Sequence, residues 1–171
     1  MTAEGEAVSK IGHGGFGTVW RIKASTAERP HLAYKVFHPQ DLDDREKVHR
    51  FERGFHAMEM LDHPCIVKVH RLTQCPYGYF MDLVDGPNLR QFVGTLDSPA
   101  ENVALLLTVA ETLNHAHARG VVHRDVKPEN ILLDFAEKGT WEAHLTDFDL
   151  SWYSTASELT KSALGAFYYA A

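Results

Sequence analysis

The chain has 171 residues, a net charge of −6 at pH 7, and an apolar fraction of 44% beside a charged fraction of 23%. This length fits one domain or two small lobes that share a cleft, and the negative charge argues against nucleic acid or an anionic membrane as the main partner. The eleven histidines are scattered, and no Cys/His spacing of the zinc type occurs.

The localisation that the sequence predicts is cytoplasmic. The two cysteines, Cys65 and Cys75, favour a reducing compartment, with a single disulfide left open. The N-terminus is polar and acidic, unlike a signal peptide. The longest apolar stretch, 103–110, is far too short to span a bilayer.

The beginning of the chain predicts strands and then a helix. Residues 8–38 alternate apolar and polar side chains with glycine punctuation, which is typical of β-hairpins. Residues 41–62 predict a helix that ends at His63-Pro64, because proline disfavours helical backbone in the residue before it. Its apolar side chains recur at helical spacing, at positions 48, 51, 55, 58 and 61.

The middle of the chain predicts two more strands and a lobe boundary. Residues 65–84 form these strands around a turn at 76–78. The Asp-Gly-Pro run at 85–87 then breaks the pattern. We therefore place one lobe at 1–84 and a second at 85–171.

The second lobe begins with the strongest helix prediction, residues 99–119, with Pro near its start and Gly120 just past its end. A loop at 137–139 and a strand at 142–146 follow, whereas 149–171 shows no clear periodicity. The apolar stripe of the helix is expected at positions 103, 106, 109, 110 and 113.

A glycine-rich turn and a strand lysine are the first candidate site residues. Residues 11–19 read IGHGGFGTV, and such glycines let main-chain N–H groups approach a phosphate, although plain tight turns have the same composition. A Rossmann dinucleotide site is excluded, since no helix opens directly after Gly17. Lys35 lies inside the apolar strand 32–36, where it either extends to water or is held beside the same phosphates.

The stretch at 121–135, VVHRDVKPENILLDF, places a dense polar loop between two apolar runs of β type. Buried polar groups are normally paired. A polar loop tied this closely to a core therefore indicates a functional site.

Four motifs follow one another in the order and rough spacing of a protein kinase: the glycine turn, the strand lysine, His123-Arg124-Asp125 with Lys127 and Asn130, and Asp147-Phe148. From Ile11 to Ala171 the chain resembles the eukaryotic-like Ser/Thr protein kinases, in particular their bacterial members. The resemblance implies an α+β, bilobal fold, with a β-rich N-terminal lobe that carries one helix and a partial helical C-terminal lobe. The nucleotide cleft would lie between the lobes.

The resemblance also implies phosphoryl transfer from ATP, with Mg²⁺, to a protein Ser or Thr hydroxyl. Asp125 would accept the hydroxyl proton, Lys127 would stabilise the transferring phosphoryl group, and Lys35 would contact the α- and β-phosphates. Asn130 and Asp147 would hold Mg²⁺ through oxygen atoms. The implied ATP-binding residues are Ile11, Gly12, Gly14, Gly17, Val19, Ala33, Lys35, Met81, Asp82, Val84 and Leu132.

Within that site the resemblance gives the adenine ring apolar neighbours. Val19 and Ala33 would cover it from above and Leu132 from below. Met81 would be the gatekeeper, and the hinge backbone at 82–84 would hydrogen-bond the adenine edge.

Other kinase-like residues would order or regulate the loop. His123 and Phe148 would pack internally beneath Met58, and Arg124 is expected to be a largely buried cation that awaits a phosphate on the activation segment. A plain polar loop would explain the acceptor candidates equally well. These candidates are Ser151, Ser154, Thr155, Ser157, Thr160 and Ser162.

The first departure from the kinase pattern concerns the partner of Lys35. The helix glutamate expected to pair with this lysine falls on Gly54, and Glu52 and Glu59 lie far round the helix. Either the helix register shifts, or Lys35 lacks its usual partner, or a local insertion restores Glu52.

Further departures lie near the end of the chain. Asp149 stands where glycine is usual, Ala166 replaces a threonine, and 165–171 stops where Pro-Glu should follow. A kinase that ended there would expose apolar side chains of the 99–119 helix. We therefore expect self-association, a swap of the 149–171 tail, or a second polypeptide that completes the fold.

Two other functions compete with the kinase hypothesis. A nucleotide-binding pseudokinase, or a regulatory interaction module with little catalysis, is favoured by the departures. A small-molecule phosphotransferase of the antibiotic-kinase type would share the Asp and Asn spacing but lacks the HRDVKPEN context.

Overall fold

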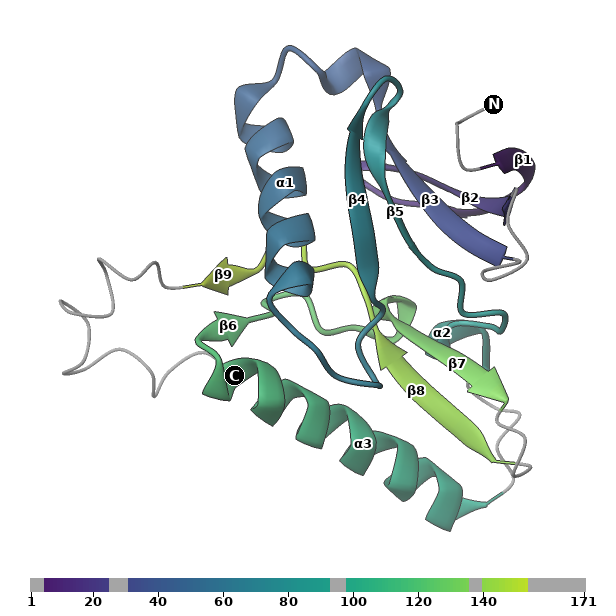
Figure 1. Ribbon diagram of the computed structural model, residues 1–171. Coiled ribbons are helices and arrows are strands. Elements are labelled where there is room, and N and C mark those ends of the chain that lie inside the picture. The colour runs from purple at the N-terminus through teal and green to yellow at the C-terminus, as the bar shows by residue number, and fades with distance from the viewer. Residues whose placement is uncertain (1–4, 25–30, 93–97, 136–139, 154–171) are drawn as a thin grey trace, which may run out of the picture.

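The computed structural model of the protein describes residues 5–24, 31–92, 98–135 and 140–153 (Figure 1). Its larger sheet is antiparallel, with strand order β1-β2-β3-β5-β4. The sequence predicted strands in these regions, but β3 and β5 bury runs of consecutive residues, 32–35 and 78–81, rather than alternating ones. The strands are β1 (Gly5–His13), β2 (Gly17–Ala24), β3 (His31–Phe37), β4 (Val69–Gln74) and β5 (Tyr77–Asp82).

Helix α1 (Arg45–Glu59) packs beside this sheet, next to β4 (Figure 1). It begins later than predicted because the Asp44 carboxylate accepts hydrogen bonds from two main-chain N–H groups of the first turn, both at 3.1 Å. The predicted stripe is confirmed within the helix, where Val48 is partly buried and Phe51, Phe55 and Met58 are buried in the core; Leu61 is also buried but lies past the end of α1, which comes earlier than predicted.

The lower part of the molecule carries the longer helix α3, the short helix α2 and two small two-stranded sheets (Figure 1). Strands β7 and β8 form a hairpin, and β6 pairs with β9 in antiparallel fashion. The β6–β9 pair was not predicted. The elements are α2 (Leu89–Phe92), α3 (Pro99–Ala118), β6 (Val121–Val122), β7 (Ile131–Phe135), β8 (Trp141–Leu145) and β9 (Trp152–Tyr153). A β-rich lobe with one helix above a smaller helical part confirms the predicted α+β fold.

The buried face of α3 agrees with the predicted stripe only at Val109 and, in part, at Leu113. The helix packs against β8 and β6 and buries Leu105, Val109, Thr112 and Ala116. The Thr112 hydroxyl can be buried because it donates to the Thr108 carbonyl at 2.7 Å. Apolar residues on several sides of this helix made the two faces hard to distinguish from spacing alone. Three large apolar residues of α3 are more than half exposed: Val103 at 64%, Leu106 at 59% and Leu107 at 56%.

The structure also bears on the cysteines and on the length of the helices. Cys65 and Cys75 are both free, so they form no disulfide. Within the described residues, no helix has the length and apolar character needed to cross a bilayer.

Candidate active site

The loop after β6 is fixed by a buried histidine. His123 is 1% exposed, lies 4.2 Å from the Phe148 ring centroid, and hydrogen-bonds the Thr146 carbonyl through Nε2 at 3.0 Å. Its Nδ1 accepts the Asp125 main-chain N–H at 3.2 Å, which requires the neutral ring with the proton on Nε2. Burial lowers the pKa of His123 and favours this neutral form. The ring thus joins the loop to the segment around Asp147.

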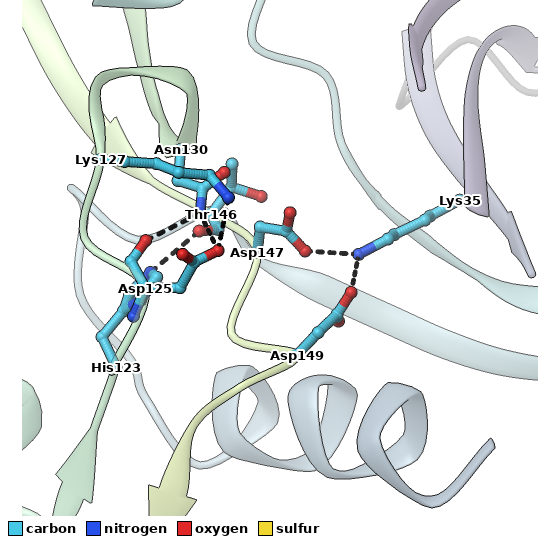
Figure 2. Close-up of polar contacts among 8 residues, drawn as sticks. All are labelled: Lys35, His123, Asp125, Lys127, Asn130, Thr146, Asp147 and Asp149. Atoms are coloured by element: carbon cyan, nitrogen blue, oxygen red, sulfur yellow. Dashed lines mark hydrogen bonds and ion pairs between the residues drawn. The ribbon is translucent and has the colours of Figure 1, made fainter. Parts of the chain in front are cut away.

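We call Asp125, Lys127 and Asn130 the Asp125 cluster (Figure 2). One carboxylate oxygen, Oδ2 of Asp125, accepts from Lys127 Nζ at 2.7 Å and from Asn130 Nδ2 at 3.0 Å. Asn130 Nδ2 also donates to the Asp125 carbonyl at 2.9 Å. The hydrogen bond to Asp125 raises the pKa of Lys127. The cluster therefore presents an oriented carboxylate beside a fixed positive charge.

We call Lys35, Asp147 and Asp149 the Lys35 cluster (Figure 2). Lys35 Nζ lies 2.6 Å from Asp147 Oδ1 and 2.6 Å from Asp149 Oδ2. It also lies 5.6 Å from the ring centroid of Phe51 and 5.7 Å from that of Tyr79. Lys35 is only 6% exposed, so the hypothesis that its side chain extends to water is wrong.

The two aspartates of the Lys35 cluster differ electrostatically. Burial raises the pKa of Asp149 to about 7, because the charge of Lys35 offsets only part of the desolvation and Asp147 repels a second negative charge. Burial also acts on Asp147, but the positive charge of Lys35 and its hydrogen bond to Asp147 outweigh it and lower the pKa of Asp147 to about 2. Lys35 has a pKa well above its ordinary value: burial opposes its charge, but both aspartates favour it.

Two residues of the site have left-handed backbone. The φ angle is 63° at Arg124 and 67° at Asp147, and neither residue is glycine. Such conformations are uncommon and persist where the surroundings determine them. Arg124 is next to Asp125, and Asp147 is itself one of the predicted site residues.

Helix α1 approaches the Lys35 cluster with a glycine. A Cβ atom at Gly54 would lie 2.5 Å from Asp149 Oδ1. Glu52 instead accepts a hydrogen bond from the Tyr77 hydroxyl, and Glu59 pairs with His56 at 3.1 Å. The hypothesis that an insertion restores Glu52 as the lysine partner is therefore wrong.

The residues expected around ATP lie mainly along the sheet. Val19 pairs with Lys35 across β2 and β3, and Ala33 pairs with Met81 across β3 and β5. Leu132 packs against the same apolar core and bridges to the chain at Asn88. Val84 is partly buried, while Asp82 and Ile11 are exposed.

Of the glycines in the turn between β1 and β2, Gly17 has a clear steric role. A Cβ atom there would lie 2.3 Å from the Val36 carbonyl oxygen, so only glycine allows this strand contact. Among the described residues, Gly12 and Gly14 have no neighbour as close: the nearest atom to a Cβ at Gly12 would be 3.4 Å away, and none of the described atoms lies within 4 Å at Gly14.

Two regulatory expectations need correction. Arg124 is exposed rather than buried, and its guanidinium lies 5.7 Å from the ring centroid of Trp152, a contact that the sequence analysis missed. Ser151 is fully buried and is therefore a poor phosphate acceptor in this structure. The remaining expectations, on Ala166, the tail swap, the end of the activation segment and five acceptor candidates, lie outside the described residues: Ser154, Thr155, Ser157, Thr160 and Ser162.

Comparison with known proteins identifies the family of the chain. The family model described as the protein kinase domain matches residues 6–171. The serine/threonine-protein kinase PkaB of Streptomyces coelicolor is 40% identical over 152 residues, which cover 82% of this chain and 35% of PkaB. PknD of Mycobacterium tuberculosis is 33% identical over 168 residues, with 94% of this chain and 24% of PknD covered.

A further relative, PrkC of Bacillus subtilis, is 31% identical over 166 residues, which cover 93% of this chain and 25% of PrkC. The chain spans about a quarter to a third of the length of these curated relatives. It belongs to the protein kinase family, as a domain of the bacterial Ser/Thr type.

Proposed function

We propose that this kinase domain transfers the γ-phosphoryl group of ATP to a protein Ser or Thr hydroxyl. The Asp125 cluster is the observation that carries this proposal, because its carboxylate is oriented by two donors on a loop with buried flanks. Asp125 would accept the proton of the acceptor hydroxyl. Lys127 would stabilise negative charge on the transferring group.

The donor chemistry of Asn130 and Asp147 fits Mg²⁺. Asn130 uses its amide nitrogen on Asp125, so its amide oxygen is the atom that would ligate a metal. Asp147 has a second carboxylate oxygen besides the one that contacts Lys35. Among the described residues, no three His, Cys, Asp or Glu side chains could hold a metal by themselves, which suits Mg²⁺ because it is commonly bound by few protein oxygens together with phosphates. Bound Mg²⁺ would neutralise charge on the β- and γ-phosphates.

The sheet would supply the nucleotide site. Lys35 would contact the α- and β-phosphates beneath the glycine turn. Val19, Ala33 and Leu132 would enclose the adenine ring beside Met81, and the backbone at 82–84 would bind its edge.

A catalytically weak nucleotide-binding module is the second candidate, and one observation favours it. Lys35 and Asp147 form an ion pair with each other, so phosphate and metal would have to compete with this contact. A domain that remained in this arrangement would bind nucleotide weakly and regulate a partner through its shape.

A transfer assay distinguishes the two candidate functions. It uses radiolabelled ATP, Mg²⁺ and a generic protein acceptor, with Asp125→Asn as the control. Transfer of label that falls by about 10²–10⁴-fold in the control supports phosphoryl transfer. Nucleotide binding without transfer supports the second candidate. Absence of both binding and transfer contradicts both.

A further inference from the structure

We propose that Asp149 is the positioning residue of Lys35 and replaces the glutamate that protein kinases ordinarily place on helix α1. Lys35 would still carry the phosphate contacts of the proposed function, so this role of Asp149 toward nucleotide rests on that function. The ion pair itself does not depend on it.

The two carboxylates beside Lys35 are equally close but differently placed. Both contacts measure 2.6 Å, yet the Asp149 side chain is 4% exposed and the Asp147 side chain 32%. A buried ion pair is screened far less than an exposed one. Figure 2 shows Asp147 between Lys35 and the Asp125 cluster, whereas Asp149 lies on the side of the helix. If Asp147 turns toward a metal, Asp149 is the carboxylate that keeps Lys35 in place.

Gly54 is the steric counterpart of Asp149. A Cβ atom at position 54 would lie 2.5 Å from Asp149 Oδ1, 2.9 Å from its Cα and 3.0 Å from its main-chain nitrogen. Any side chain on α1 at this point would displace either the helix or the aspartate. Glycine is a poor helix former, so its presence inside α1 is explained by the room that it leaves. The glycine at position 54 and the aspartate at position 149, which both depart from the kinase pattern, therefore compensate for each other.

The three glutamates of α1 contact residues other than Lys35. Glu52 accepts from the Tyr77 hydroxyl, Glu59 pairs with His56 at 3.1 Å, and Glu46 pairs with Arg50. Asp149 Oδ1, in contrast, is buried with no hydrogen-bond partner in the described part of the chain. A buried polar atom left unpaired is unfavourable, and the contact of Oδ2 with Lys35 must offset this destabilisation.

Four proteins test this role: the wild type, Asp149→Asn, Lys35→Met and the double variant. The affinity for a fluorescent ADP analogue with Mg²⁺ is measured for each, together with the thermal unfolding midpoint. Glu52→Gln is the matched control, because it neutralises a carboxylate on α1 while its amide oxygen can still accept from Tyr77. We expect Asp149→Asn to weaken nucleotide binding by about 10-fold or more, with no change in the control. In the Lys35→Met background, Asp149→Asn should have no further effect on affinity.

A residue that merely stabilised the fold would behave differently. An equal loss of affinity on adding Asp149→Asn to the wild type and to Lys35→Met would overturn the proposal, as would an equal loss in Glu52→Gln. If the wild type binds no nucleotide, the proposed function fails, and the unfolding midpoints still decide the role of Asp149. Asp149→Asn should lower the midpoint where Lys35 is present, and leave it unchanged or raise it in the Lys35→Met background. Equal decreases in both backgrounds would overturn the ion pair.

Discussion

The Asp125 cluster and the Lys35 cluster both hold a lysine against a carboxylate, but in different surroundings. The Lys127 side chain is 45% exposed, whereas the Lys35 side chain is 7% exposed and contacts two carboxylates. Exposed ion pairs add little stability, whereas breaking a buried pair leaves an uncompensated charge. The pair in the Asp125 cluster is therefore held weakly, whereas the Lys35 cluster joins β3 to the segment after β8 through a largely buried contact.

The largest expected effects distinguish the role of Asp125 from that of Asp147. Asp125→Ala should lower turnover by about 10²–10⁴-fold and spare nucleotide binding, because its carboxylate is proposed to act only on the hydroxyl proton. Asp147→Ala should abolish Mg²⁺-dependent nucleotide binding. Kinetic assays measure the turnover, and titration calorimetry with and without Mg²⁺ measures the binding. Equal losses of nucleotide affinity in the two variants would contradict the division of tasks.

The next largest effect concerns the two lysines, which should contribute differently to the free energy of unfolding. Lys35→Met should lower the free energy of unfolding by about 3–5 kcal/mol, since it leaves the buried side chain of Asp149 and the partly exposed side chain of Asp147 without their cation. Lys127→Met should lower it by at most about 1 kcal/mol, because its pair with Asp125 is partly in water. Urea unfolding of both variants measures the difference. Similar losses would mean that the two clusters are equally important for stability.

His123 joins the two clusters, so its removal should loosen both. His123→Phe keeps an aromatic ring but leaves the Thr146 carbonyl and the Asp125 N–H without their partner. We expect a loss of about 1–3 kcal/mol in the free energy of unfolding. A variant as stable as the wild type would show that packing on Phe148 alone holds the loop.

The same histidine predicts a pH dependence. Burial lowers the pKa of His123 in the folded state from its ordinary value of 6.5. As the pH falls below that value, the unfolded chain takes up a proton that the folded chain does not, so stability decreases until the folded pKa is reached. Comparing the unfolding free energy of wild type and His123→Phe between about pH 5 and pH 7 isolates this contribution. A constant difference across that range would argue against a buried neutral ring.

The smallest effect is expected where apolar side chains are exposed. Leu106→Gln and Leu107→Gln should change the free energy of unfolding by less than about 0.5 kcal/mol, since both side chains are more than half exposed. The same changes should lower any concentration-dependent increase in molar mass seen by light scattering. Undiminished association in the double variant would assign it to another surface.

The sequence predicted the Asp125 cluster better than the Lys35 cluster, for a physical reason. Asp125, Lys127 and Asn130 lie within one short loop, so a local motif defines them. The contact of Gly54 with Asp149 joins distant segments, and each residue alone looks like a defect. Only their packing in three dimensions shows that the missing side chain and the added carboxylate compensate for each other.

Secondary structure was predicted where one periodic pattern dominated. The stripe of α1 was predicted correctly because polar residues separate its apolar positions. In α3 the predicted stripe included Val103 and Leu106, which the structure leaves exposed. The two-residue strands β6 and β9 are too short to give a pattern, and their pairing depends on tertiary contacts.

The left-handed backbone of Arg124 and Asp147 bears on how the domain could evolve in the laboratory. Such a conformation costs a non-glycine residue about 1–3 kcal/mol, and glycine adopts it freely. A selection for heat resistance alone should accept glycine at position 124, whose side chain is exposed, and reject it at 147, where the ion pair with Lys35 would be lost. Variants enriched by such a selection would thus separate backbone relief from the chemistry that each side chain supplies.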